Sequence, residues 1–294
     1  HYNPLGEMID LQDGDKITHL SGNSTALECP TLSLPWCVKL LMCSLMILPH
    51  YTSARTMAEF EKRQYSHQDE VLPYRILYPE GFKATGSYPL VLFLHGSGER
   101  GNDNEAQLIH GSSLFLDPDN RRQYPAVIVF PQCPKTDAWT RRTIKKTDNG
   151  KEFYFKKGGK PSGSMKMLLQ LMDSLHQLPF IDQKRIYVGG LSMGGMGTFE
   201  LVRRRPDMFA AAFPICGGGN PKNARSYADK LPFWIFHGAK DKVVPPRYSE
   251  LMVKAIRSHG GQVKFSLYPE ANHNSWDKAF AEPDLLPWLF TKSK

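Results

Sequence analysis

The residues Gly190-Leu191-Ser192-Met193-Gly194 match the pattern G-x-S-x-G, in which a serine stands between two glycines. A short apolar run, 185–189, precedes them and is typical of a buried strand. The residues that follow, 195–202, indicate the beginning of a helix. A serine on such a sharp strand-to-helix turn presents its hydroxyl outside the sheet, and the glycines relieve the crowding. The sequence therefore predicts a nucleophile at Ser192 and acyl transfer through a covalent acyl-serine.

A serine hydroxyl needs a base to take its proton, and the base needs a carboxylate that fixes its tautomer and stabilises its cation. After a serine turn of this kind, the partners follow later strands in the order Asp, then His. Asp241 lies just beyond the apolar segment 233–236, and His273 lies just beyond the segment 263–268. The sequence therefore predicts that Ser192, Asp241 and His273 converge as a catalytic triad.

The oxyanion that forms during attack on a carbonyl needs two backbone N–H donors. We expect one of them at Met193, which follows the nucleophile at the start of the helix. The other is expected in the loop after strand 89–94. In that loop Ser97 stands between Gly96 and Gly98, so its backbone can approach a substrate closely.

Four further side chains near the expected strand ends have a structural and a functional interpretation. Trp139 and Trp276 are predicted to contact substrate, since an aromatic wall suits a ring or a sugar; the alternative is a place in the core. His95 and His237 each precede a glycine at a strand end. We interpret both as structural histidines that hold loops rather than transfer protons.

Strands and helices alternate from Glu59 onward. The predicted strands are 72–78, 89–94, 126–130, 185–189, 210–215, 233–236 and 263–268, and the predicted helices are 165–178, 195–202, 247–258 and a last one that runs to Leu289. This alternation predicts an α/β fold, a doubly wound and mostly parallel sheet with helices on both faces. Pro73 predicts that the first strand lies at an edge of the sheet.

The composition bounds the partners of the chain. Its 294 residues carry a net charge of +8, with one local concentration of basic residues between Arg141 and Lys160. This concentration lies within a long connection, 136–163, of the kind that forms lids and binding loops. No RNA- or DNA-binding signature accompanies it, so no nucleic-acid partner is expected. A solvated basic loop is favoured over a site for a polyanion.

Five cysteines are present, and neither a C-x-x-C spacing nor a Cys/His cluster suggests a metal site. Cys133 and Cys216 each follow a predicted strand. The expected strand order puts two strands between them, which is too far for a disulfide, so both are predicted to be buried thiols. No metal and no cofactor are predicted.

Residues 1–56 differ from the rest and are expected to form an N-terminal tail, with a single catalytic domain over 57–294. Lys39 precedes an apolar run, 40–48, and small residues follow, so that 38–54 resembles a secretory signal peptide. The run is too short for a membrane span, so no stable membrane insertion is expected. Secretion or a periplasmic location is predicted; the alternative is a cytoplasmic protein whose translation begins near Met57.

With these residues in view, the chain resembles the α/β-hydrolase superfamily. More narrowly, it resembles phospholipase/carboxylesterase-like and predicted-peptidase hydrolases related to dienelactone hydrolase and to feruloyl and acetylxylan esterases. The resemblance spans about 74–289, and its carriers are 94–104, 131–134 with Trp139, 190–195, 215–219, 237–245 and 273–276. It implies Ser192 as nucleophile, Asp241 as acid and His273 as base.

The motifs and the resemblance together predict a serine carboxylic ester hydrolase. The substrate hypothesis is a feruloyl or acetyl ester of plant cell-wall polysaccharide, because of the resemblance, the expected export and the aromatic residues near the site. The alternative is a serine peptidase of the prolyl oligopeptidase type, which uses the same triad. A catalytically silent scaffold used for binding is a third interpretation, which the intact triad disfavours.

Overall fold

The computed structural model describes residues 59–148 and 150–294. The chain divides into the units His1–His50 and Tyr51–Lys294, and all described residues belong to the second. The expected tail and its signal-like segment, 38–54, lie outside the described residues. Within the described ranges, no helix is long and apolar enough to cross a membrane.

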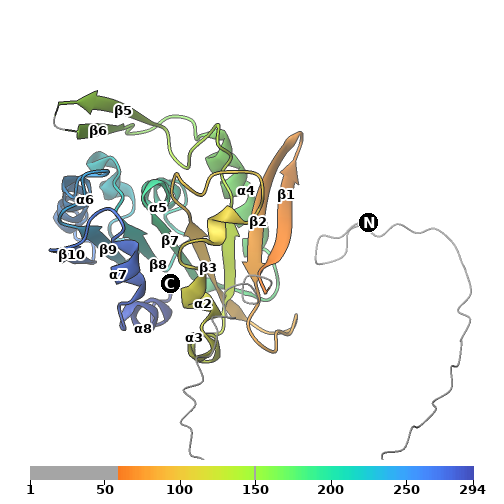
Figure 1. Cartoon of the computed structure of the whole chain (residues 1–294). Coiled ribbons are helices and arrows are strands. Elements are labelled where there is room, and N and C mark those ends of the chain that lie inside the picture. The colour runs from red at the N-terminus through yellow and green to blue at the C-terminus, as the bar shows by residue number, and fades with distance from the viewer. Residues whose placement is uncertain (1–58, 149) are drawn as a thin grey trace, which may run out of the picture. The chain divides into compact units, whose positions relative to one another are not determined.

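An eight-stranded sheet forms the centre of the domain, in the order β1-β2-β4-β3-β7-β8-β9-β10 (Figure 1). Its strands are β1 (Glu61–His67), β2 (Glu70–Leu77), β3 (Tyr88–Leu94), β4 (Val127–Pro131), β7 (Ile181–Leu191), β8 (Ala211–Ile215), β9 (Phe233–Gly238) and β10 (Val263–Tyr268). The strands from β4 to β10 in this order pair in parallel, and β1 and β2 are antiparallel. The prediction of a mostly parallel, doubly wound sheet is confirmed.

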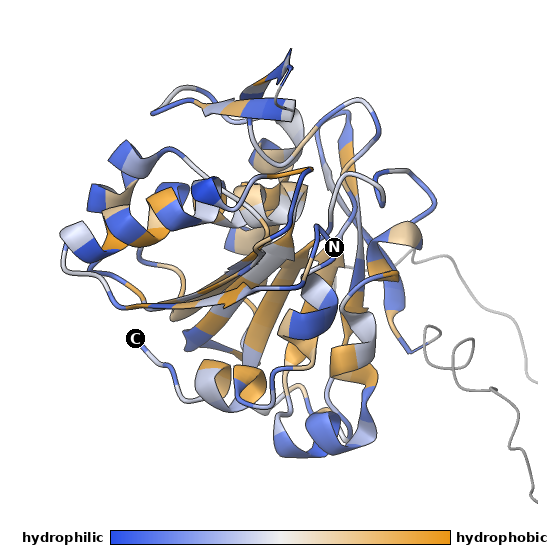
Figure 2. Cartoon of the chain, turned by 60° about the vertical axis from the view of Figure 1, so that its left-hand side comes forward, coloured by the Kyte–Doolittle hydropathy of each residue, from blue (hydrophilic) through white to orange (hydrophobic). Residues whose placement is uncertain are grey.

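Two hydrophobic layers cover the sheet, one on each face. The first is formed with α4 (Gly163–His176), α5 (Met193–Arg204), α6 (Arg247–Ser258) and the short η2 (Pro221–Ser226). The second is formed with η1 (Ala106–Leu108), α2 (Ser112–Leu116), α7 (Trp276–Phe280) and α8 (Leu285–Phe290), and α3 (Pro118–Gln123) follows α2. Figure 2 shows hydrophobic residues along the central strands and on the helix sides that face them. Burial on both faces explains why the inner strands are continuous apolar runs.

Strand β2 is not the edge strand that Pro73 suggested. A tight hairpin adds β1 outside it, with Gln64 opposite Pro73. The last pair that β2 forms with β4 is Tyr74 with Pro131, so the missing N–H of Pro73 falls just past the end of that ladder. A proline is thus tolerated in the inner strand β2 because the neighbouring strand β4 ends before it reaches Pro73.

The last helix of the sequence prediction is two short helices, α7 and α8. Pro283 lies between them. A proline has no N–H to donate and disfavours helical geometry in the residue before it, so one continuous helix cannot form here.

The long basic connection contains a two-stranded antiparallel hairpin, β5 (Arg142–Thr147) and β6 (Gly150–Phe155), separate from the main sheet. Figure 1 shows it above α5 and α6. The backbone N–H of Phe153 donates to the Tyr248 hydroxyl at 2.7 Å, and the Asn220 side chain donates to the Phe155 carbonyl at 2.8 Å. An isolated hairpin is marginal in water, so these contacts with α6 and the η2 segment hold it in place.

Candidate active site

Ser192 occupies the turn between β7 and α5 with φ 53° and ψ −112°. A non-glycine residue in this region is strained by about 1–3 kcal/mol, and such strain persists only where the surroundings fix it. Here the Ser192 N–H donates to the Ile215 carbonyl of β8 at 2.9 Å. The turn is therefore the sharp strand-to-helix elbow that its sequence predicted.

Two glycines of the elbow are required by close backbone approach. A Cβ atom on Gly194 would collide with the carbonyl oxygen of Leu94, at the end of β3. A Cβ atom on Gly190 would lie 2.6 Å from the carbonyl carbon of Gly194. Only glycine lets α5 start this close to the sheet, and this closeness places Ser192 at the sheet edge.

Three strand ends bring a hydroxyl, an imidazole and a carboxylate together. The Ser192 hydroxyl donates to His273 Nε2 at 2.9 Å. His273 Nδ1–H donates to Asp241 Oδ2 at 2.7 Å. These side chains follow β7, β10 and β9, whose carboxyl ends lie at the same edge of the sheet.

The Asp241 carboxylate is buried and accepts four hydrogen bonds or close N–H contacts. Oδ1 accepts from the backbone N–H groups of Val243 and Val244, at 2.8 and 2.9 Å. Oδ2 faces His273 Nδ1 at 2.7 Å and His237 Nε2 at 3.2 Å. Burial alone would raise the pKa of Asp241, but the hydrogen bonds from both histidines outweigh it and hold that pKa well below its ordinary value. Asp241 is therefore ionised and fixed in orientation.

His95 lies beneath the loop that follows β3. Its Nδ1–H donates to the Gly96 carbonyl at 2.6 Å, and its Nε2 accepts from the Cys133 N–H at 2.9 Å. Burial lowers the pKa of His95 to about 4, so the ring is neutral near pH 7. It ties the β3 and β4 loops together.

A cavity of about 370 Å³ opens in front of Ser192. Its wall includes Ser97, Met193 and Trp276, which were predicted to surround the reacting carbonyl. The Trp276 ring meets the His273 ring edge-on, with centroids 5.5 Å apart.

Trp139 corrects the sequence prediction. It is fully buried, and its indole N–H donates to the His95 carbonyl at 3.1 Å, so it supports the loop from below and does not line the cavity. Its indole packs against the backbone at Gly197, where a Cβ atom would lie 2.5 Å from the Trp139 Cβ. A loop position in the sequence did not reveal that the side chain points inward.

The hairpin supplies cavity residues that the sequence analysis missed. Arg142, Ile144, Lys151 and Phe153 line the wall that faces Ser192. A signal was available, because Asn-Gly at 149–150 between alternating side chains is a strong short-range indication of a two-residue hairpin turn.

One set of possible metal ligands lies among the described residues, namely Cys216, Asp241 and His273, whose ligand atoms lie within 4.8 Å of one another. Burial raises the pKa of the Cys216 thiol far above its ordinary value, so it offers a poor metal ligand. Asp241 and His273 are already bonded to each other. This set does not fit a divalent cation.

Cys133 is also buried, and burial raises the pKa of its thiol to about 11. Both thiols are free. Strands β3 and β7 lie between β4 and β8, after which the two cysteines stand, as predicted.

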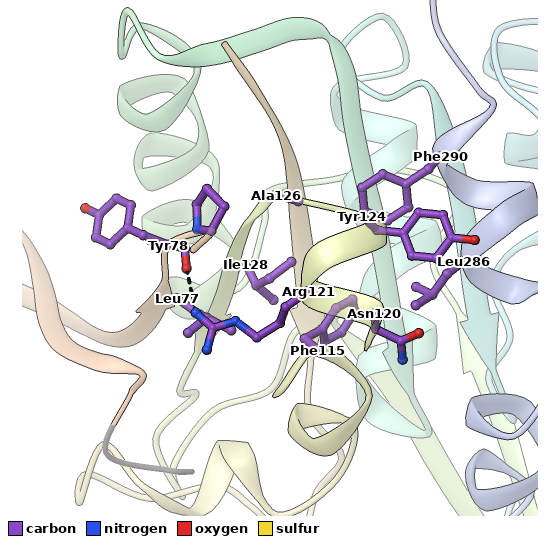
Figure 3. A pocket seen from close by; sticks show the side chains of 11 residues that line it. Leu77, Tyr78, Phe115, Asn120, Arg121, Tyr124, Ala126, Ile128, Leu286 and Phe290 are labelled. Atoms are coloured by element: carbon purple, nitrogen blue, oxygen red, sulfur yellow. Dashed lines mark hydrogen bonds between the residues drawn. The ribbon is translucent and has the colours of Figure 1, made fainter. Parts of the chain in front are cut away.

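A second cavity lies at the opposite edge of the sheet, beside the start of β4 (Figure 3). Apolar side chains such as Leu77, Phe115 and Phe290 surround it, and Arg121 reaches across to donate to the Tyr78 carbonyl at 3.2 Å. Its volume of about 20 Å³ leaves room for one water molecule and excludes an ester substrate.

The sequence profile of the dienelactone hydrolase family matches residues 136–284, about half of the chain. This stretch contains Ser192, Asp241 and His273, as well as the hairpin.

Two curated relatives match shorter stretches. The bifunctional acetylxylan esterase/xylanase XynS20E of Neocallimastix patriciarum is 33% identical over 88 residues, which cover 30% of this chain and 13% of that protein. Poly(3-hydroxyalkanoate) depolymerase C of Paucimonas lemoignei is 27% identical over 128 residues, covering 34% of this chain and 31% of that protein. The chain therefore spans less than a third of the length of either relative.

Solved structures match over most of the domain. A thermostable esterase has 31% identity and a TM-score of 0.72, covering 82% of this chain and 64% of that one. A ferulic acid esterase from Anaeromyces mucronatus, in complex with ferulic acid, has 14% identity and a TM-score of 0.57, covering 77% and 89%. Dipeptidyl peptidase 4 of Porphyromonas gingivalis has 16% identity and a TM-score of 0.56, covering 83% and 38%. These likenesses establish the α/β-hydrolase fold.

Proposed function

The chain belongs to the dienelactone hydrolase family and is a hydrolase of the esterase kind, and we propose that it cleaves carboxylic esters through an acyl-serine at Ser192. The observation that carries this proposal is the continuous hydrogen-bond chain from the Ser192 hydroxyl through His273 to Asp241. No other described side chain that lines the cavity combines a hydroxyl with a base at 2.9 Å.

In the first half-reaction, His273 Nε2 takes the proton of Ser192 Oγ while the oxygen attacks the ester carbonyl. Asp241 stabilises the imidazolium that forms, because it is ionised and bonded to Nδ1–H. The imidazolium then donates its proton to the leaving alcohol. In the second half-reaction, His273 Nε2 takes a proton from the water that attacks the acyl carbon. It then returns this proton to Ser192 Oγ as the acyl C–O bond breaks, which releases the acid and restores the free serine.

We assign the oxyanion hole to the backbone N–H groups of Met193 and Ser97. Met193 is the first residue of α5, where the backbone N–H has no partner within the helix and the helix dipole favours negative charge. Ser97 lies on the same cavity wall. Removal of one donor from a pair of this kind lowers turnover about 10²–10³-fold.

The substrate that we propose is a feruloyl or acetyl ester of plant cell-wall polysaccharide. The cavity is open to solvent and is lined in part by the hairpin, which suits an ester group that projects from a polymer. Trp276 offers an aromatic wall next to His273, where an aromatic acyl group or a sugar can stack. The names of the relatives, an acetylxylan esterase and a ferulic acid esterase, support the same class.

The test is a fluorophosphonate probe followed by a substrate panel. We expect the probe to label the protein and to fail on Ser192→Ala. Turnover is then measured on methyl ferulate, acetylated xylan, 4-nitrophenyl acetate and a chromogenic peptide. Absence of labelling would contradict the serine mechanism, and faster cleavage of the peptide than of every ester would favour the peptidase alternative.

Such polymers lie outside cells, so we further propose that the protein is exported and that 38–54 acts as its signal. Cell fractionation of the native host tests this. Enzyme found only in the cytoplasm would contradict it.

A further inference from the structure

The segment that carries the hairpin is strongly basic. Between 141 and 160 it contains eight cations and two carboxylates, Asp148 and Glu152. The eight cations are Arg141, Arg142, Lys145, Lys146, Lys151, Lys156, Lys157 and Lys160. We call this stretch the basic segment. Its net charge of +6 compares with +8 for the whole chain.

None of these cations forms an ion pair with a carboxylate of residues 59–148 or 150–294. On α5, by contrast, consecutive cations are paired: Arg203 and Arg204 share Glu200, and Arg205, which follows the helix, bonds Asp173. In the hairpin, Lys146 lies directly opposite Lys151 across the two strands. Like charges in this position destabilise a hairpin, so their presence needs another reason.

The cations continue from the cavity outward. Arg142 and Lys151 line the cavity that contains Ser192. The Nε of Arg142 is buried without a hydrogen-bond partner among the described residues, and its Nη1 makes one long bond, of 3.4 Å, to the Thr140 carbonyl. The other lysines of the segment are exposed and do not line this cavity. A small ester held in the cavity reaches only Arg142 and Lys151, whereas a long anion reaches the outer lysines as well.

We propose that the ester is carried by a polyanion, a polysaccharide that bears carboxylates, and that this chain lies along the basic segment while its ester group enters the cavity. This rests on the proposed function and narrows its substrate class from polysaccharide to acidic polysaccharide. Unpaired cations beside a reacting group raise the local concentration of an anionic substrate and speed its binding, and salt screens that attraction.

A nucleic acid fits the segment less well. Proteins that bind single strands add exposed aromatic faces on which bases stack. The exposed ring of the hairpin, Tyr154, is covered by the Lys145 ammonium at 5.3 Å from its centroid, and Phe153 is buried.

The test compares two polymers and one small ester on the full-length protein. The probes are O-acetylated polygalacturonate, acetylated xylan without uronic acid groups, and 4-nitrophenyl acetate. We expect kcat/KM on the acidic polymer to exceed that on the neutral one at least tenfold at 20 mM salt, and to fall about tenfold at 200 mM. Over the same range, hydrolysis of 4-nitrophenyl acetate changes less than twofold.

A charge-matched pair of triple variants isolates the segment. Lys145→Gln/Lys146→Gln/Lys157→Gln is expected to lower the ratio of acidic-polymer to 4-nitrophenyl acetate activity about tenfold. The control Lys83→Gln/Lys184→Gln/Lys254→Gln removes the same charge from exposed positions outside the basic segment and leaves the ratio unchanged.

Equal and salt-insensitive activity on both polymers, with 4-nitrophenyl acetate still cleaved, overturns this proposal and leaves the esterase proposal standing. Tight binding of single-stranded DNA without preference for the acidic ester also overturns it. Loss of all ester hydrolysis and of fluorophosphonate labelling would instead contradict the proposed function.

A second and independent observation concerns His237, which is fully buried. Its Nε2 faces two acceptors, the Val244 carbonyl at 2.8 Å and Asp241 Oδ2 at 3.2 Å, so Nε2 carries a proton. Its Nδ1 bonds the Ser249 hydroxyl at 2.7 Å. The same oxygen of Asp241 therefore receives an N–H from His237 and from His273.

The geometry points to His237 as a positioning residue of the proposed reaction. Its N–H withdraws charge from Asp241 Oδ2 and so weakens the pull of the carboxylate on the His273 imidazolium. The same contact fixes the orientation of the Asp241 carboxylate that holds His273.

Two substitutions separate this role from packing. In His237→Gln the amide nitrogen can replace Nε2, whereas in His237→Asn it can replace only Nδ1. We expect kcat to fall about tenfold or more in the Asn variant and to stay near its original value in the Gln variant, with KM little changed in both.

An equal loss of kcat in both variants would leave only a structural role for His237. A measurement on the unchanged protein keeps the idea falsifiable if the Asn variant does not fold. Nitrogen NMR must find the His237 proton on Nε2; a bare Nε2 rejects the proposal.

Discussion

Ser192, Asp241 and His273 reach the cavity from the ends of buried parallel strands, whereas Arg142 and Lys151 reach it from a hairpin outside the sheet. We call the first region the rim. In the rim, hydrogen bonds join the side chains of Ser192, His273 and Asp241, and backbone contacts leave no room for a methyl group at Gly194. The hairpin has unpaired charges, exposed side chains and few anchoring bonds.

This difference between the rim and the hairpin matches the different structural demands of proton transfer and of substrate recognition. Proton transfer requires atoms within hydrogen-bond distance, which a packed core can enforce. Recognition of a long anion needs charge spread over a surface, with little demand on the position of each group. In the proposed function, one cavity therefore combines a rigid reactive wall with a charged wall that selects the substrate.

The largest expected effect is a loss of turnover when the rim is changed at Ser192. Ser192→Ala removes the proposed nucleophile and should lower turnover on 4-nitrophenyl acetate by about six orders of magnitude, since a triad acts as a unit. Steady-state kinetics with active-site titration measures it. Ile144→Ala on the hairpin is the matched change at the opposite cavity wall and should keep fluorophosphonate labelling. A Ser192→Ala protein with more than a hundredth of the original turnover would show that another group attacks the ester.

The second-largest difference is expected when one methyl group is added to the backbone of each region. Gly194→Ala places a Cβ against the Leu94 carbonyl, so α5 must move, and we expect a loss of several kcal/mol in the free energy of unfolding. Gly158→Ala, beside the hairpin, meets nothing within 4 Å and should change stability by less than about 0.5 kcal/mol. Urea unfolding of both variants is the measurement, and equal effects would show that the two backbones are equally tolerant.

A third prediction concerns acid stability at the base of the rim. The folded pKa of His95, about 4, lies below its ordinary value of 6.5, so the unfolded chain binds the proton first as the pH falls. Stability is thus complete above about pH 6.5 and is lost progressively toward pH 4. At pH 5 the loss from this group is about 2 kcal/mol.

His95→Gln keeps an acceptor for the Cys133 N–H and cannot titrate. The decline in unfolding free energy between pH 7 and pH 5 should be about 2 kcal/mol smaller in this variant. An identical decline in both proteins would mean that His95 is not the group that titrates.

The smallest effect concerns the anchoring of the hairpin. Tyr248→Phe removes the acceptor of the Phe153 N–H and should cost about 1 kcal/mol of the free energy that docks the hairpin. Hydrogen exchange at Phe153 should rise about fivefold, while exchange at Ser192 stays constant. A parallel rise at Ser192 would show that the two regions open together.

Most of the main sheet could be predicted from sequence because buried parallel strands are continuous apolar runs. Helix α6 and strand β10 have the predicted bounds, 247–258 and 263–268. The edge strand β1 was missed because it is half-exposed and polar, without an apolar run. Pro73 led to the wrong prediction of an edge strand for a related reason. The hydrogen bond that a proline loses in a sheet depends on how far the neighbouring strand extends, and the local sequence does not show this.

Within the candidate site, the order of Ser192, Asp241 and His273 along the chain was sufficient to predict that they converge, because parallel strands end at one edge of the sheet. The orientation of Trp139 was not predictable, since a loop residue can point inward or outward with the same sequence. The sequence also did not predict that His237 and His273 both contact Asp241 Oδ2. Such contacts depend on N···O distances that are set by the packing of three separate segments.

By itself the sequence determined the elbow, the strand order that carries its partners, and the class of chemistry, since each follows from local patterns and from the geometry of parallel sheets. Only the tertiary structure decided which side chains face the reacting group. In the sequence, Arg142 and Lys151 belong to what resembles an ordinary solvated loop. They line the cavity when the hairpin packs on Tyr248. The interaction between two charges depends on the distance between them, and only the fold sets that distance for residues far apart in the sequence.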